Sequence, residues 1–238
     1  MQLSNTFAAS LALTFSLANV AGAQLIGPSG GTGLSGEYAS AANSPFAALS
    51  FGSFYLETFE DHLLNVPGVS ASAGGVTSVV FGPSIHDSVD FDDGALDGSG
   101  LQGDSYFAAG LPGIIFTFNA GTLGALPTHA GLVWTDGDGT TQFEAFDQNG
   151  ISLGFLAANL QNGSFNGETS EDRFFGAINA GGISAIKISN TSGGIEIDHL
   201  QYGLAAAPPV PEPETWAMML AGLGLFGAAV RRRRAGPA

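Results

Sequence analysis

Residues 141–157 read TQFEAFDQNGISLGFLA. Two apolar runs flank Asp147-Gln148-Asn149-Gly150, and their phenylalanine, isoleucine and leucine residues suit a half-buried, pleated surface. Asn-Gly readily adopts the positive φ angles that a two-residue hairpin turn requires. The stretch therefore predicts an antiparallel β-hairpin.

Similar runs recur on both sides of this hairpin, separated by clusters of glycine, asparagine and aspartate. Helical periodicity is rare, and the 36 glycines disfavour long helices. Many short strands with frequent turn signals predict an all-β protein with a β-sandwich or jelly-roll fold. The candidate strands are residues 53–59, 76–81, 113–118, 129–135, 141–147, 151–157, 173–178, 183–189 and 195–202.

The charge of the central region restricts its partners. The chain has a formal charge of −15, and all 21 acidic residues except Glu212 and Glu214 lie between residues 24 and 210, with only Arg173 and Lys187 as basic residues. Nucleic acid and anionic lipid surfaces are therefore excluded as partners, because both require clustered basic residues. The absence of cysteine removes thiol catalysis and cysteine-ligated metals.

The N-terminal residues predict export. Residues 7–20 form an apolar run, and Ala21-Gly22-Ala23 fits the small-x-small pattern cut by signal peptidase. No lysine or arginine precedes the run, so either its positive charge comes from the terminal amine alone or the true start of the protein lies elsewhere. We therefore expect a helical signal peptide over residues 1–23, a flexible glycine-rich lead over 24–36 and a sandwich over 37–204.

The C-terminal residues predict a single membrane-spanning helix. Residues 215–230 carry no charge, and as a helix they extend about 24 Å, against a bilayer core of about 30 Å. Four arginines follow at 231–234 and favour the cytoplasmic side. A plain anchor, a buried core helix and a disordered tail are the alternatives, and membrane insertion is favoured because the segment has no polar face.

The order of these parts resembles the PEP-CTERM sorting signal of exported bacterial proteins. An alanine- and proline-rich linker at 205–210 precedes a matching tripeptide, apolar span and arginine cluster, and the last four residues run slightly beyond the usual ending. The resemblance covers residues 211–238 and implies that an exosortase recognises and removes the tail. The residues that match the tripeptide are Pro211, Glu212 and Pro213. Those that match the arginine cluster are Arg231, Arg232, Arg233 and Arg234.

The sandwich region also resembles the passenger domains of many PEP-CTERM proteins. The similarity lies in FEAFDQNGISLG, EDRFFGAI, GGISAIKISN and GGIEIDHLQYG. It implies a β-sandwich related in shape to carbohydrate-binding modules. The resemblance implies the fold more firmly than it implies what the domain binds, because proteins with the same fold carry different binding sites.

Calcium is the favoured cofactor, because it takes six to eight oxygen ligands and acidic residues are abundant. Carbohydrate-binding jelly rolls often join the first and last strands through calcium, and the matching residues are Glu57, Glu60, Asp61 and Asp198. Strand alternation places Glu60 on the opposite face from Glu57 and Asp61 unless a bulge intervenes.

A second possible location for calcium is the acidic segment at 87–104, which lacks EF-hand spacing and is interpreted as a solvated loop. Asp136-Gly137-Asp138-Gly139 is interpreted as a turn.

Catalysis has little support in the sequence. Residues 27–31 match G-x-S-x-G but lack the flanking strand and helix that expose a nucleophile, and the four histidines form no metal-binding pair. With so many acidic residues, two carboxylates could lie at the separation that glycoside hydrolysis requires, but no pattern in the sequence points to a particular pair. Sugar binding requires exposed aromatic rings, for which the candidates are Tyr38, Tyr55, Tyr106, Trp134 and Tyr202, with Trp134 assigned to the core.

These observations predict a non-enzymatic exported protein, processed by signal peptidase and exosortase and held transiently at the inner membrane. Its destination is the cell surface or the extracellular matrix, where the sandwich binds polysaccharide. The alternatives are a secreted polysaccharide hydrolase and a purely structural matrix protein.

Overall fold

A computed structural model describes most of the chain. The described residues are 22–29, 37–82, 87–110, 112–161, 163, 167, 169–206 and 213–234. Two compact units divide at residue 205, and each is described by itself. The predicted signal peptide lies outside the described residues except for its last two positions, as do Pro211 and Glu212 of the tripeptide.

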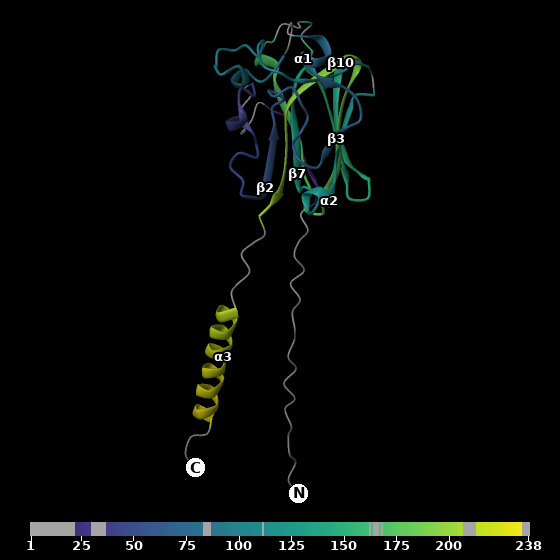
Figure 1. Cartoon of the computed structure of the whole chain (residues 1–238). Helices are drawn as coiled ribbons and strands as arrows, with labels where there is room; N and C mark the ends of the chain where they lie inside the picture. The colour runs from purple at the N-terminus through teal and green to yellow at the C-terminus, as the bar shows by residue number, and fades with distance from the viewer. Residues whose placement is uncertain are drawn as a thin grey trace. The chain divides into compact units, whose positions relative to one another are not determined.

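The first unit is an all-β domain built on one antiparallel sheet (Figure 1). Its strands are β1 (Gln24–Ser29), β2 (Phe51–Glu57), β3 (Val69–Ala71), β4 (Gly75–Val76), β5 (Tyr106–Ala108), β6 (Ile114–Phe118), β7 (His129–Asp147), β8 (Ser152–Asn159), β9 (Arg173–Ile178) and β10 (Ile183–Ala205). The short helices are η1 (Ala41–Asn43), α1 (Thr77–Phe81), η2 (Asp90–Asp93), α2 (Ala120–Leu123) and η3 (Thr169–Glu171).

Strands β7 and β10 are long, pair with each other along their length and divide the sheet into two halves. In the first half, residues 129–137 of β7 pair with residues 195–203 of β10, and β9, β2 and β5 flank them. In the second half, residues 141–147 of β7 pair with residues 183–190 of β10, flanked by β8 and β6. The register shifts between the halves, where Gly139 and Gly193 have φ angles of 79° and 68°.

The two halves pack face to face, which makes the domain a β-sandwich. The Phe118 ring of β6 lies 4.8 Å from the Tyr202 ring of β10, and these residues belong to different halves. Inward positions alternate with outward ones along β6, where Ile114, Phe116 and Phe118 are buried. The predicted β-sandwich is therefore confirmed, and burial of these apolar faces stabilises it.

A smaller core lies on the outer face of the first half. The segments 37–49 and 87–105 cover this face, and their apolar side chains meet those of β7 and β9 there. Its buried members are Tyr38, Phe46, Val89, Val133 and Phe174. Segment 87–105 is also the most acidic stretch of the chain, so folding buries some of its carboxylates.

Most predicted strands form, and two pairs of them merge. Residues 129–135 and 141–147 belong to β7, so Asp136-Gly137-Asp138-Gly139 lies within a strand and the predicted turn there is wrong. Residues 183–189 and 195–202 likewise belong to β10. The hairpin at Asp147–Gly150 is confirmed, with Gly150 N donating to the Asp147 carbonyl at 3.0 Å. The predicted two-residue turn is wrong, because the Asp147 N–H bonds to the Ile151 carbonyl and, of Asn149 and Gly150, only Gly150 has a positive φ, of 74°.

Two predictions at other strands are wrong. Residues 77–81 form α1 instead of a strand, because the Asp104 carboxylate accepts the Ser78 N–H at the helix start and Gly82 ends the helix at φ 79°. The flexible lead is also wrong for residues 24–29, which form β1 on the edge of β9. Leu25 packs against the main core there, and this burial offsets the entropy cost of ordering the segment. Residues 30–36 lie outside the described residues.

The second unit contains α3 (Pro213–Arg234). The predicted helix at 215–230 therefore forms and continues through Arg231 to Arg234. Over the described residues, no helix has the length and hydropathy that a membrane crossing requires.

Candidate functional site

The acids predicted to hold calcium make separate local contacts. The Glu57 carboxylate accepts backbone N–H bonds from Phe59, Asn65 and Val66, which closes the loop that follows β2. Asp61 is exposed and accepts a hydrogen bond from the Asn65 side chain in the same loop. Both acids therefore stabilise a turn.

The other two predicted ligands lie elsewhere. Glu60 Oε1 accepts the Asp104 N–H at 2.6 Å. Asp198 is fully buried on β10, and its ligand atoms group with those of Asp92 and His199, all within 4.8 Å of one another. Among the described residues, Asp198 is thus not grouped with the other three predicted ligands.

The Asp92–Asp198–His199 group is hydrogen-bonded internally. His199 Nε2 lies 3.1 Å and 3.0 Å from the two carboxylate oxygens of Asp92, and its Nδ1 lies 3.2 Å from the Tyr38 hydroxyl. Burial and then the charge of Asp92 raise the pKa of Asp198. The group links segment 87–105 to β10.

The acidic segment at 87–104 is folded, and the interpretation as a solvated loop is wrong for three of its acids. Asp87, Asp90 and Asp104 are buried. Asp90 Oδ1 accepts the backbone N–H groups of Asp97, Gly98 and Ser99, at 3.0 to 3.1 Å. These bonds fix the turn of the segment, so its carboxylates are placed by structure.

Asp104 connects that segment to α1. Its carboxylate accepts hydrogen bonds from the Ser78 N–H, the Ser78 hydroxyl and the Thr77 hydroxyl, and lies 2.5 Å from His62 Nδ1. Burial acts to raise the pKa of Asp104, but the hydrogen bonds from Ser78, His62 and Thr77 outweigh it and lower the pKa. Asp104 is therefore held as a carboxylate that anchors the helix start.

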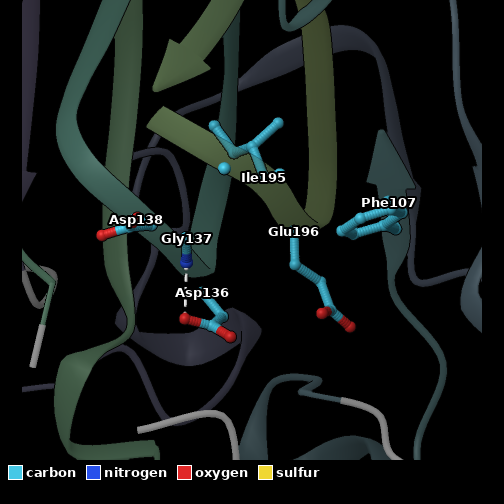
Figure 2. Close-up of a pocket in the computed structure, with 8 residues that line it drawn as sticks. Phe107, Asp136, Gly137, Asp138, Ile195 and Glu196 are labelled. Carbon is cyan, nitrogen blue, oxygen red and sulfur yellow. Dashed lines mark hydrogen bonds between the residues drawn. The ribbon is translucent and has the colours of Figure 1, made fainter. Parts of the chain in front are cut away.

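An acidic hollow of about 240 Å³ opens where the two halves of the sheet meet (Figure 2). Asp136 of β7 and Glu196 of β10 are direct register partners, and Figure 2 shows their carboxyl groups on the same side of the strands. The absence of a side chain at Gly194 makes room for a ring, since a Cβ there would lie 2.5 Å from Phe107. The lining residues are Phe107, Asp136, Gly137, Asp138, Gly193, Gly194, Ile195 and Glu196.

Two of the carboxyl groups that line the acidic hollow, those of Asp136 and Glu196, have raised pKa values. Burial is the main cause at Glu196, whose pKa is about 7 even though Ser105 and the Asp87 N–H donate to it. Burial also raises the pKa of Asp136 to about 6, against the effect of a hydrogen bond from the Gly137 N–H. Near neutral pH the pair can both donate and accept protons, which is the property that general acid–base chemistry uses.

A second hollow, also of about 240 Å³, lies on the outward face of the second half. We call it the polar hollow, and its lining residues are Gln142, Glu144, Phe155, Lys187 and Ser189. Glu144 of β7 pairs with Phe155 of β8 on one side and with Lys187 of β10 on the other. Phe143 and Ile186, the neighbours of Glu144 and Lys187 along their strands, are buried. Because alternate residues of a strand face opposite ways, the side chains of Glu144 and Lys187 point outward.

The side chains of the polar hollow are available to a ligand. Phe155 is 69% exposed, the highest value among the aromatic side chains described in the sandwich. The structure gives Gln142, Glu144 and Lys187 no side-chain hydrogen bond or ion pair with another described residue. An exposed ring beside three unpaired polar groups can stack on an apolar surface while the polar groups bond to hydroxyls.

Four of the five aromatic residues predicted from the sequence are buried, and the fifth, Tyr55, is half-buried and packs against the core. Trp134, Tyr38, Tyr106 and Tyr202 are buried, so the assignment of Trp134 to the core is confirmed and the other three cannot stack on a sugar. Phe155 was not predicted because Phe155 and Leu156 are adjacent, and the sequence does not show which of the two faces outward. Leu156 packs against the core.

Residues 209–234 match the model of the PEP-CTERM protein-sorting motif. No curated protein matches the chain. Among solved structures, the chain is similar to the C-terminal family 22 carbohydrate-binding module of Clostridium thermocellum Xyn10B. The sequences are 15% identical, the match covers 68% of this chain and 99% of that chain, and the TM-score is 0.30.

The match at the C-terminus confirms the sorting signal predicted from the tripeptide, the apolar span and the arginines. The motif is the recognition element of exosortase substrates, and it defines an exported and sorted protein. The chain is therefore an exported protein with a β-sandwich ahead of a PEP-CTERM tail.

Proposed function

We propose that the sandwich is a non-enzymatic module that binds extracellular polysaccharide at the polar hollow. The observation that carries this proposal is the position of Phe155, whose exposed ring lies beside Gln142, Glu144 and Lys187. A pyranose ring has an apolar C–H face that stacks on an aromatic ring, and hydroxyls that bond to amide, carboxylate and ammonium groups. Phe155 therefore supplies the stacking surface, and the other three orient the sugar.

The setting on an open sheet face favours a polymer over a small molecule. The lining residues come from β7, β8 and β10 and face outward, so a chain can enter and leave across the strands. The charge of the sandwich favours a neutral polysaccharide, because Arg173 and Lys187 are its only basic residues.

The same proposal includes processing and location. Signal peptidase removes residues 1–23, the apolar helix holds the protein transiently at the inner membrane, and exosortase releases it by cutting the tail. The sandwich then acts at the cell surface or in the matrix. The matched sorting motif supports this order of events.

The experiment is affinity electrophoresis of the purified protein in gels that contain neutral polysaccharides, for example xylan or a soluble β-glucan. We expect at least one of them to retard the protein, and Phe155→Ala to abolish the retardation. Ile151→Ala is the matched control, because Ile151 lies on the same hairpin and is 63% exposed but does not line the hollow. Equal retardation of Phe155→Ala and the unaltered protein contradicts the proposal.

The hydrolase alternative has one observation in its favour, the pair Asp136 and Glu196 in the acidic hollow. Two adjacent carboxyl groups with different pKa values are the usual catalytic residues of glycosidases. On our proposal the protein releases no reducing ends from a polysaccharide that it binds. Release of reducing ends that Glu196→Gln abolishes would favour the hydrolase instead.

A further inference from the structure

A β-bulge in β10 brings two neighbouring side chains to the same side of the sheet. The register with β7 shifts directly after Asp198, where two residues of β10 lie opposite one of β7. His199 lies in this bulge with a φ of 42°, which is uncommon for a residue other than glycine. In a regular strand Asp198 and His199 would face opposite ways. Here the Asp198 carboxylate accepts the Val89 N–H, and the His199 ring contacts Asp92, so both side chains meet segment 87–105.

These contacts gather three metal-binding side chains under the covering segment. One ligand atom each from Asp92, Asp198 and His199 lies within 4.8 Å of the other two. The side chains of His199 and Asp92 are 2% and 8% exposed, and Asp198 has no exposed surface. In a tetrahedral site with metal–ligand distances of about 2.1 Å, the ligand atoms are about 3.4 Å apart. His199 Nε2 already lies 3.0 Å from Asp92, so small side-chain rotations bring the three atoms to that spacing.

The two aspartates of this group lack a full counter-charge. Among the described residues, neither carboxylate has an ion pair with a lysine or an arginine. A protonated His199 would offset only one of the two negative charges. Burying an uncompensated charge costs several kcal/mol, and a like charge nearby adds to that cost. A divalent cation would neutralise both carboxylates while His199 stays neutral.

The surroundings of His199 leave its Nε2 atom available to a metal. Its Nδ1 lies 3.2 Å from the Tyr38 hydroxyl, which also accepts a hydrogen bond from the Gln201 side-chain amide. The Ser44 hydroxyl in turn donates to the Gln201 side-chain carbonyl. A proton on Nδ1, donated to Tyr38, leaves the lone pair of Nε2 facing Asp92. Histidines that bind metals are commonly oriented in this way, by a hydrogen bond from the other ring nitrogen.

We propose that Asp92, Asp198 and His199 form a binding site for a divalent transition metal, and that the metal is Zn²⁺. Zinc accepts imidazole nitrogen and carboxylate oxygen, and three protein ligands leave a fourth position for water. Calcium is disfavoured, because it takes six to eight oxygen ligands and imidazole is softer than the ligands it prefers. The site retains Asp198 of the predicted calcium site and none of its other ligands.

The metal would fasten the covering segment to the sheet. Asp92 belongs to η2 in segment 87–105, whereas Asp198 and His199 belong to β10. The hydrogen bond from the Val89 N–H to Asp198, of 2.9 Å, joins the same two elements. Neither the acidic hollow nor the polar hollow is lined by any of the three ligands. We therefore assign the metal a structural role that does not depend on polysaccharide binding.

The test measures the melting temperature of the full-length protein, purified without a histidine tag, in EDTA and then with Zn²⁺, Mn²⁺, Ca²⁺ or Mg²⁺ in its place. At about 100 times its Kd, Zn²⁺ is expected to raise the melting temperature by roughly 5–10 °C. Mn²⁺ should require a higher concentration, because it binds such ligands more weakly than zinc, and Ca²⁺ and Mg²⁺ should have little effect. Elemental analysis after dialysis against Zn²⁺ and then metal-free buffer should find one zinc per chain.

Asp92→Asn separates metal binding from a merely structural contact. The asparagine oxygen can still accept a hydrogen bond from His199 Nε2, so in EDTA the variant should melt close to the temperature of the unaltered protein. Its Kd for Zn²⁺ should rise by more than about 100-fold, because even partners that only orient a ligand contribute 10–100-fold. His199→Gln should weaken Zn²⁺ binding in the same way, which provides a second, independent variant.

His62→Gln is the matched control. His62 Nδ1 lies 2.5 Å from the Asp104 carboxylate, so the chain contains a second histidine–aspartate pair. The His62 side chain is 64% exposed, and among the described residues this pair has no third ligand grouped with it. We expect His62→Gln to leave the response to Zn²⁺ unchanged.

Three outcomes overturn the proposal. The first is an unaltered protein that neither retains zinc nor melts higher with it. The second is a Zn²⁺ response that survives in Asp92→Asn and His199→Gln but is lost in His62→Gln, which assigns the zinc to an exposed histidine. The third is a response to Ca²⁺ that exceeds the response to Zn²⁺, which makes calcium the cofactor.

Discussion

Phe143 of β7 stacks against Phe175 of β9, with ring centroids 5.8 Å apart and ring planes inclined by 26°. Phe143 belongs to the second half of the sheet, whereas Phe175 lies beside the first half. Both rings are fully buried. The pair therefore joins the two layers of the sandwich, and the polar hollow lies on the outside of one of them.

Phe175→Ala should strongly destabilise the protein. Removing a fully buried phenylalanine leaves a cavity between the layers and costs about 3–5 kcal/mol of unfolding free energy. For a domain of this size the melting temperature should fall by about 10 °C. Thermal unfolding followed by circular dichroism measures the change.

Phe155→Ala is the matched comparison, because it removes the same ring from an exposed position. We expect its unfolding free energy to change by no more than about 0.5 kcal/mol. Comparable losses in the two variants would contradict the assignment of Phe175 to the interior and Phe155 to the surface.

Stability should depend on pH through Asp136. Burial raises its folded-state pKa to about 6, from an ordinary value of 3.8. The folded state therefore holds this proton more tightly than the unfolded state does. The resulting stability is fully present below about pH 4 and is lost as the pH rises through 6, a change of roughly 1–3 kcal/mol.

Asp136→Asn should flatten this dependence between pH 4 and pH 7, because asparagine does not titrate. Its side-chain oxygen can still accept the Gly137 N–H that Asp136 accepts. Urea unfolding in EDTA at several pH values measures the effect, with Asp97→Asn as the control. An unchanged slope in Asp136→Asn would show that Asp136 does not titrate abnormally.

The sequence predicts local structure better than it predicts which residues meet. Gly150 specifies the hairpin through its φ of 74°, because turn chemistry is local. Asp136-Gly137 has similar turn chemistry, yet pairing with β10 on one side keeps it in a strand. Residues 76–81 are apolar and resemble a strand, but the Asp104 carboxylate, distant in sequence, stabilises the start of a helix there.

The candidate sites were harder to predict for the same reason. The meeting of Asp92 with Asp198 and His199 was not predicted, because no spacing motif links Asp92 to the other two. Asp92 and His199 come together only when segment 87–105 folds over the sheet, where the Val89 N–H also bonds to Asp198. Alternation along a strand shows which residues share a face, but it does not show which loop covers that face.

Processing should depend on the tripeptide. Replacing Pro211 and Pro213 together by alanine should leave the protein in the membrane fraction of its native host, because the sorting motif is altered while the helix and arginines remain. Pro208→Ala is the control, since Pro208 precedes the matched residues. Fractionation and immunoblotting measure the distribution. Release of the double variant at the normal level would contradict recognition of the tripeptide.

Polysaccharide binding should be insensitive to salt. The proposed contacts are stacking on Phe155 and hydrogen bonds to Gln142, Glu144 and Lys187, and neither kind of contact to a neutral sugar is screened by ions. We expect the Kd for a neutral polysaccharide to change by less than about twofold between low and high ionic strength. Lys187→Met should weaken binding by removing a donor without changing this insensitivity. If instead the affinity falls steeply with salt and Lys187→Met removes that fall, the ligand is an anionic polymer held by Lys187, and the neutral polysaccharide is the wrong substrate class.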